Sequence, residues 1–253
     1  MRLLKADLYH WLKDRVLWAL LGLTFLMPLL TSIMTNSMSG DVKGGIEALV
    51  FKGLGTDILC VLIGVALASF FGKEYQNNTI RNKVCYGEPK VKVASIFFLE
   101  AALVGIVFVL TSIAGSFFFG IFFCTWEFAE GFLLKLLLQT LILIAFSFTV
   151  SAVSIAAKSF KAGLIYVVLV TVMLGAVSHL FPVSAGQNEA FAVISRILYM
   201  TVSDMLMNSK DGVYAVRNYN FDGLYLNSLI VALSYSALSV GVCLLIVRKH
   251  SYK

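Results

Sequence analysis

The residues with the clearest chemical potential lie in one polar segment between two apolar runs. The segment reads Gly72-Lys73-Glu74-Tyr75-Gln76-Asn77-Asn78-Thr79-Ile80-Arg81-Asn82-Lys83, and Gly87 follows. Its charged and amide side chains can hydrogen-bond to a polar groove, while Tyr75 and Ile80 can fill apolar pockets, as anchors of protein interfaces do. Asn78-Thr79 suits the start of a short helix. The segment is longer than a simple connection needs, so it is either a docking surface for a soluble partner or a solvated loop.

Glu100 is the second candidate, because it is the one acidic residue well inside a predicted membrane span. An ionisable group costs roughly 2.5 kcal/mol or more at the bilayer centre and less near the interface. A residue kept at that cost is a candidate for a pore or gate. The alternative is that Glu100 lies near the headgroups, or pairs with Lys92 or a basic residue of another helix.

Patterns for catalysis, nucleotide binding or metal binding do not occur in the sequence. It contains no GxxxxGK[ST], HExxH or GxSxG pattern. The four cysteines, Cys60, Cys85, Cys124 and Cys243, form no CxxC pair and no metal spacing. We therefore expect no enzyme, no catalytic residue and no cofactor or metal in this chain. If ATP drives the protein, the ATPase is a separate chain.

The elements that must position these residues are membrane spans. The chain is 59% hydrophobic and 13% charged, whereas soluble domains have about 25% charged residues. Its apolar runs reach the roughly 20 residues that cross a bilayer and lack the alternation of barrel strands. We expect an all-α integral membrane protein in which residues 1–253 form one transmembrane domain. The six predicted spans cover residues 16–34, 56–72, 93–119, 136–157, 162–181 and 223–247.

Lysine and arginine predict the orientation, because they concentrate on the cytoplasmic side of membrane proteins. With six spans, fourteen of the twenty basic residues and five of the fourteen acidic residues fall on the side that carries both termini. We therefore expect both termini to be cytoplasmic and residues 188–222 to lie outside. The net charge of +6 follows from this bias, so it does not indicate nucleic-acid binding.

The segment before the first span has an apolar face. Leu4, Leu8, Trp11 and Leu12 share one side of a helix over residues 1–15. This pattern predicts an interfacial amphipathic helix with Trp11 as a headgroup anchor in the membrane lipid. A plain cytoplasmic extension of the first span is the alternative.

The long outer loop between the fifth and sixth spans, residues 182–222, also has an apolar pattern. Phe191, Ile194, Leu198 and Val202 recur at helical spacing. We expect outer helices that fold back onto the membrane part. A surface loop with one short helix is the alternative.

The polar segment also resembles a known family. Glu74-Tyr75, Asn77 and the run Thr79-Ile80-Arg81-Asn82-Lys83 are similar to the loop after the second span in permeases of the type-2 ABC exporter family. That loop has a short acidic-aromatic lead, a Thr-Ile-Arg core and then a glycine, which Gly87 supplies here. The resemblance in sequence covers about twelve residues, while the layout of spans is similar over the whole chain.

The resemblance implies a permease of the bacterial plasma membrane with six helices per subunit and two subunits per pore. The second subunit is another copy or a homologous permease. It implies that the segment is a coupling helix that contacts an ABC-type ATPase, two copies of which bind ATP and Mg. The contact residues would be Glu74, Tyr75, Asn77, Thr79, Ile80, Arg81, Asn82 and Lys83. The outer helices would close the exit.

The expected function is export of an amphipathic or hydrophobic substrate, such as a peptide, an antimicrobial, a drug or a lipid-like molecule. Few charges within the spans argue against a pore for small ions. The alternative is a membrane self-protection or immunity protein that binds a toxic peptide without transporting it. A secondary transporter needs charges at mid-membrane and repeat symmetry, and the sequence shows neither clearly.

Overall fold

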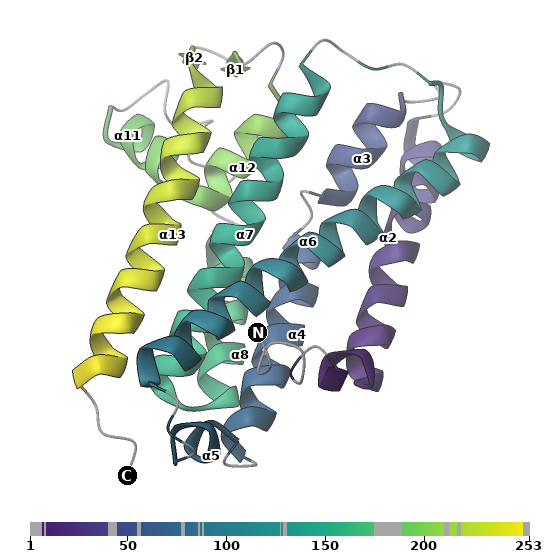
Figure 1. The fold of residues 1–253 in the computed structure, drawn as a ribbon. Helices are drawn as coiled ribbons and strands as arrows, with labels where there is room; N and C mark the ends of the chain where they lie inside the picture. Colours follow the sequence, from purple (N-terminus) through teal and green to yellow (C-terminus); the bar gives the residue numbers. More distant parts are fainter. Residues whose placement is uncertain are drawn as a thin grey trace.

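A computed structural model describes residues 7, 9–39, 45–54, 57–76, 79–85, 87, 89–126, 128, 131–174, 189–209, 213–216 and 219–249. Most of these residues are helical, which confirms the expected all-α class (Figure 1). The helices are α2 (Arg15–Ser39), α3 (Ile46–Leu54), α4 (Asp57–Gln76), α5 (Thr79–Cys85), α6 (Lys90–Phe123), α7 (Phe132–Ala157), α8 (Phe160–Val168), α11 (Glu189–Ile197), α12 (Tyr199–Met207) and α13 (Leu224–Lys249). A π-helical turn, η1 (Leu169–Leu174), continues α8.

Four helices are long and apolar enough to cross a membrane, and they lie in α2, α6, α7 and α13. Two bent pairs raise the number to as many as six. The first is Ile46–Leu54 with Ile58–Glu74, bent by 41°, and the second is Ala190–Ile197 with Tyr199–Met207, bent by 87°. These helices indicate a multi-pass membrane protein.

The structure adds a helix before the second predicted span and describes only part of the fifth. The second, predicted at residues 56–72, is α4, and the unpredicted helix α3 precedes it. The fifth, predicted at residues 162–181, is a shorter apolar helix over Phe160–Met173, and its predicted end lies outside the described residues. Hydropathy locates apolar runs, but it does not show where a chain bends within them.

The segment between the last two predicted spans contains two short helices, α11 and α12, where the apolar periodicity predicted helical structure. It also contains an unpredicted antiparallel hairpin of strands β1 (Tyr214–Val216) and β2 (Tyr219–Phe221), in which Tyr214 is opposite Phe221. The aromatic and β-branched residues of these strands favour extended structure. That local signal was present in the sequence.

The N-terminal segment packs against the bundle. Asp7 and residues 9–12 are helical. Trp11 is 7% exposed and makes an edge-to-face contact with Phe70, with 4.8 Å between the ring centroids. This corrects the expectation that Trp11 anchors in the headgroups, because its ring is buried within the chain, whereas Leu12 is exposed.

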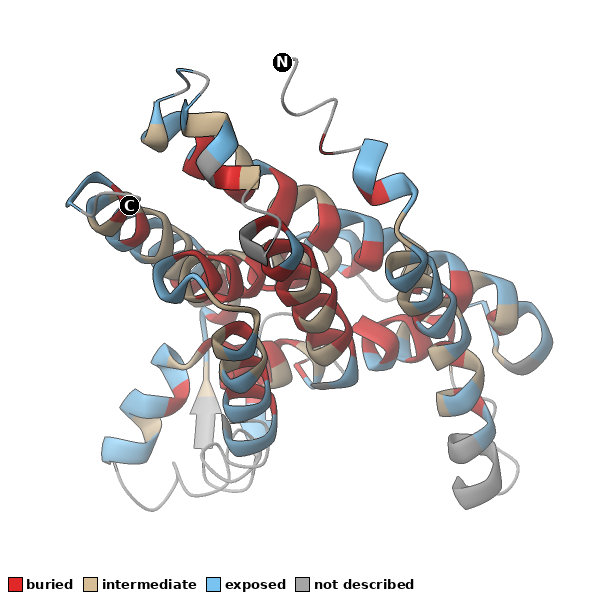
Figure 2. Ribbon diagram, turned by 90° about the horizontal axis from the view of Figure 1, so that it is seen from below, coloured by how far each residue is buried: buried red, intermediate tan, exposed pale blue. Residues whose placement is uncertain are grey.

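Buried residues lie on the faces that the helices turn toward one another, as the view along the bundle shows (Figure 2). Small residues allow the closest of these contacts. Gly64, Ala68 and Gly72 are four residues apart on α4, which is the small-residue spacing typical of membrane helix pairs. A Cβ added at Gly64 would overlap the Val167 side chain of α8, and one at Gly72 would lie 2.5 Å from the Phe160 Cβ. The backbones of α4 and α8 are therefore close.

Two buried polar side chains of α7 hold the outer segment. Lys135 donates to the Ser209 carbonyl at 2.7 Å, and its ammonium is 3.8 Å from Glu47 of α3. Gln139 donates to the Ser203 hydroxyl of α12 at 2.7 Å. Sequence reasoning counted Lys135 among the outer charges but did not predict that it is buried.

We predict that Gly64→Ala destabilises the protein, because the stiff Val167 side chain leaves no room for a Cβ. The expected cost is about 1–3 kcal/mol, as for other overpacked sites. Unfolding by SDS in mixed micelles measures it. Adding Val167→Ala should restore part of the loss. Gly241→Ala is the matched control, since nothing lies within 4 Å of a Cβ at that position. Equal destabilisation by the two Gly→Ala changes would contradict the prediction.

Candidate functional site

The seven-residue helix α5 lies at one end of the bundle, between α4 and α6 (Figure 1). Asn82 and Cys85 are exposed and Thr79 is half-buried. Their spacing of three residues places them on neighbouring positions of one helical face. Ile80 is 3% exposed and belongs to the apolar core. The helix therefore presents a short polar face and buries its opposite side.

The structure places the predicted contact residues in two groups. Thr79 and Asn82 lie on the outer face of α5, whereas Glu74, Ile80 and Lys83 lie mostly inside the chain. The burial of Ile80 corrects the expectation that it offers an exposed apolar anchor. The side chains of Tyr75 and Arg81, and the whole of Asn77, lie outside the described part of the chain.

Lys83 is the centre of a buried ion-pair cluster. Its ammonium lies 2.9 Å from each carboxylate oxygen of Asp7 and 3.1 Å from Glu74 Oε2. The ammonium also lies 5.2 Å from the centroid of the Phe97 ring of α6. One cation thus joins the N-terminal segment, the end of α4 and α5.

The charged form of Lys83 is favoured in this cluster. Burial acts to lower the pKa of Lys83, but the hydrogen bond to Asp7 and the negative charge of Glu74 outweigh it, so the pKa lies above its ordinary value of 10.5. A lysine with a raised pKa stabilises the fold at all pH values below its unfolded pKa, and this contribution disappears as the pH rises through the folded pKa. The Lys83 ammonium is therefore charged at neutral pH and loses its proton only in strongly alkaline solution.

Glu100 lies on α6, one helical turn after Phe97. It is 0% exposed, and neither of its carboxylate oxygens has a hydrogen-bond partner among the described residues. The pore or gate role of Glu100 stays a prediction.

Sequence reasoning missed Asp7, which it counted only as one of the acidic residues on the cytoplasmic side. A signal was present, because Asp7 precedes Trp11 by four residues and therefore lies on the same side of a helix. An acidic residue in line with a buried tryptophan needs a partner in the protein. The partner, Lys83, is 76 residues away in the sequence.

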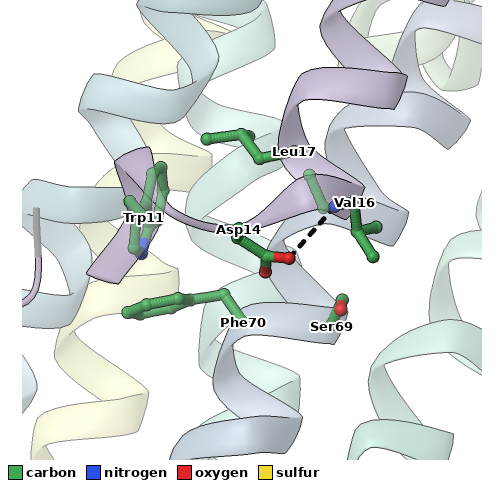
Figure 3. Close-up of a pocket in the computed structure, with 7 residues that line it drawn as sticks. Trp11, Asp14, Val16, Leu17, Ser69 and Phe70 are labelled. Atoms are coloured by element: carbon green, nitrogen blue, oxygen red, sulfur yellow. Dashed lines mark hydrogen bonds between the residues drawn. The ribbon is translucent and has the colours of Figure 1, made fainter. Parts of the chain in front are cut away.

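Two pockets share Asp14 and Phe70, and one of them includes Glu74 of the cluster. One, of about 310 Å³, is lined by His10, Lys13, Asp14, Phe70, Lys73, Glu74 and Thr79. The other is a crevice between the N-terminal segment, α2 and α4, lined by Trp11, Asp14, Val16, Leu17, Ala66, Ser69 and Phe70, in which Asp14 accepts a hydrogen bond from the Val16 amide at 3.1 Å (Figure 3). The crevice volume of about 10 Å³ has room for roughly one water molecule. The crevice is therefore too small to form a pathway for a peptide or lipid.

We predict that Lys83→Met destabilises the protein by about 3–5 kcal/mol, the usual cost of removing one member of a buried ion pair. The loss leaves Asp7 and Glu74 without their cation. Lys73→Met is the matched control, since Lys73 pairs with Asp14 at 2.5 Å but is half-exposed, and such pairs contribute about 1 kcal/mol or less. SDS unfolding of both variants gives the comparison. Similar losses for the two would show that the cluster is not a buried ion pair.

No protein-family model matches the chain, and no curated protein matches it in sequence. A function must therefore be inferred from its own residues and their arrangement.

Proposed function

We propose that the chain is the membrane-spanning permease subunit of an ATP-driven ABC exporter. It works with two copies of a separate ATPase and with a second permease copy or a homologous permease. The observation that carries the proposal is α5: a short helix with an exposed polar face lies at one end of the bundle. It coincides with the segment whose residues resemble a coupling helix.

The attachment of α5 supports a role in transmitting force. Its inner side is fixed by Ile80 in the core and by the bonds of Lys83 to Asp7 and Glu74. A partner that moved the outer face would therefore move the end of α4 and the N-terminal segment with it. The helix that follows, α6, extends over 34 residues, or about 50 Å at 1.5 Å per residue. Movement at the α5 end can thus reach the opposite end of the bundle.

The proposed topology has six spans with both termini in the cytoplasm. Basic residues lie at the α5 end of several helices, and they are Arg15, Lys73, Lys83, Lys90, Lys92, Lys158, Arg248 and Lys249. Their position agrees with the positive-inside rule if this end faces the cytoplasm. In this topology the bent pair of α3 and α4 and the apolar helix over Phe160–Met173 supply the two remaining membrane crossings beside the four long helices.

The proposed substrate is amphipathic or hydrophobic. Large apolar side chains are exposed along α13, among them Leu226, Ile230, Leu233, Leu238 and Leu245. Lipid or a second subunit can cover such a face, and a pathway built between two subunits would have similar apolar walls. Peptides, antimicrobials, drugs and lipid-like molecules fit that chemistry.

Asn82→Trp should block docking of the ATPase, because a bulky ring at the centre of the exposed face prevents a close fit. We expect at least a tenfold loss of ATPase recovered with the tagged permease, which corresponds to about 1.4 kcal/mol. Asn208→Trp is the matched control, because Asn208 is also exposed at a helix end, on the outer segment. The partner is identified by cross-linking from the exposed thiol of Cys85 and by its phosphate-binding loop.

Two results would overturn the exporter proposal in favour of the immunity alternative. One is a set of cross-linked proteins without any P-loop ATPase. The other is toxin protection that persists unchanged in a strain without the ATPase. Loss of ATPase binding only in Asn82→Trp, together with loss of export, would support it.

Thiol labelling tests the orientation. In a Cys124→Ser background, Cys85 should resist a membrane-impermeant maleimide in intact spheroplasts and react after permeabilisation. With Cys85 also replaced by serine, an Asn208→Cys variant should react in intact spheroplasts. The buried thiols Cys60 and Cys243 should contribute little in either case. The reverse labelling pattern would show that the α5 end faces outward.

A further inference from the structure

The larger of the two pockets, of about 310 Å³, has a basic wall. Three side chains that carry N–H donors line it, those of His10, Lys13 and Lys73. All three are accessible from outside the chain. A water molecule needs about 10–15 Å³ of a cavity, so this pocket has room for a group the size of a phosphate. The pocket can therefore hold a small anionic group against several donors.

The two acidic side chains of the pocket already have partners in the chain. Asp14 accepts a hydrogen bond from the Lys73 ammonium at 2.5 Å. Glu74 accepts one from Lys83 at 3.1 Å. Asp7, the other acid that binds Lys83, does not line the pocket. The negative charges of the pocket are therefore each offset by a neighbouring lysine.

Lys13 has no carboxylate partner among the described residues, and its ammonium lies 4.3 Å from the centroid of the Tyr9 ring. Lys73 has three N–H donors, one of which is bonded to Asp14. The pocket thus offers one unpaired positive charge and several free donors. A phosphodiester carries a single negative charge and accepts charge-assisted hydrogen bonds from lysine. Its charge and its acceptors match what the pocket provides.

Two helices with the character of membrane spans end at this pocket. The apolar stretch of α2 begins at Arg15, next to Asp14, and that of α4 ends at Glu74. The pocket therefore lies where the apolar part of the bundle gives way to polar surroundings, which is the headgroup layer of a bilayer. Both leaflets have such a layer, so this placement holds whichever side of the membrane the α5 end faces.

Large apolar side chains are exposed beside the pocket. They include Leu12, Val16 and Trp18, and the Trp18 indole donates to the Leu12 carbonyl at 2.8 Å. Leu23 and Leu26 continue the exposed apolar surface along α2. A soluble anion would leave these side chains uncovered, whereas the acyl chains of a lipid can lie against them. The surroundings of the pocket therefore favour a lipid over a soluble phosphate compound.

We propose that the pocket binds the phosphodiester headgroup of an anionic membrane lipid. Lys13 and Lys73 are its main ligands, His10 adds a ring donor, and the acyl chains lie along the exposed apolar surface of α2. The site does not depend on the exporter function. The bound lipid joins the N-terminal segment to α2 and α4 from outside, while Lys83 holds the same segment from inside.

Native mass spectrometry of the full chain measures the affinity, with phosphatidylglycerol and zwitterionic phosphatidylcholine of the same acyl chains as the two probes. The parent should bind phosphatidylglycerol more tightly. Lys13→Gln should weaken this binding by about fivefold, the usual contribution of a lysine near an anionic lipid surface. Lys161→Gln is the matched control, because Lys161 is also an exposed lysine at a helix start but does not line the pocket.

Asp14→Asn should have the opposite effect. An asparagine oxygen can still accept the hydrogen bond from the Val16 amide at the start of α2, but it no longer neutralises the Lys73 ammonium. We expect the affinity for phosphatidylglycerol to rise by about fivefold. Equal losses in Lys13→Gln and Lys161→Gln would overturn the proposal, because the lipid would then respond only to the general charge of this end.

Soluble probes distinguish a lipid from a free phosphate compound. Glycerol 3-phosphate and inorganic phosphate have the phosphate group but no acyl chain. Neither should displace phosphatidylglycerol when present at the same concentration as the lipid. Displacement by either probe at that concentration would show that the pocket recognises a soluble phosphate, and this would overturn the assignment to a lipid.

Quenching of tryptophan fluorescence locates the lipid without a comparison of affinities. In a Trp126→Phe chain, Trp18 is the exposed tryptophan that remains, since Trp11 is 7% exposed. In phosphatidylcholine nanodiscs, a small fraction of brominated phosphatidylglycerol should quench more strongly than the same fraction of brominated phosphatidylcholine. Lys13→Gln in the same background should remove the difference. Equal quenching by the two brominated lipids before that change would overturn the proposal.

Discussion

The end of the bundle that contains α5 depends on the ammonium of Lys83. Asp7, Glu74 and Lys83 come from three segments, and no two of them are adjacent in sequence. In an apolar bundle each of these groups would be costly alone. Together they position α5 against α4 and the N-terminal segment, and this arrangement turns Asn82 outward. The polar face proposed for docking therefore depends on an interaction on the opposite side of the helix.

A buried lysine joins separate segments of the chain at both ends of the bundle. At the end opposite α5, Lys135 donates to the Ser209 carbonyl and approaches Glu47. A buried cation thus holds a separate segment to the long helices at each end, while close packing of small residues joins helices such as α4 and α8 between them. Because each ammonium is buried in apolar surroundings, it has few alternative partners, and its contacts are therefore specific.

Hydropathy and charge predicted the apolar helices, the short helix after α4 and the outer helices, because these signals are local in sequence. The bend between α3 and α4, the burial of Ile80 and the contact of Trp11 with Phe70 could not be predicted in this way. They depend on which helices become neighbours. Glu100 is fully buried, but its place in the sequence does not show which side chains pack around it. Aromatic and β-branched residues did indicate the β1–β2 hairpin, and here a local signal was overlooked.

The length of α6 has a consequence for the surrounding bilayer. Figure 1 shows α6 running obliquely across the bundle, and it contacts α2, α3 and α7 on its way. A helix of about 50 Å exceeds a hydrocarbon thickness of about 30 Å, so a membrane-spanning α6 has to tilt, or the lipid around it has to thicken. A thicker bilayer favours a more upright α6, and a more upright helix covers less area in the membrane plane. The cross-sectional footprint of this protein should thus respond to lipid chain length.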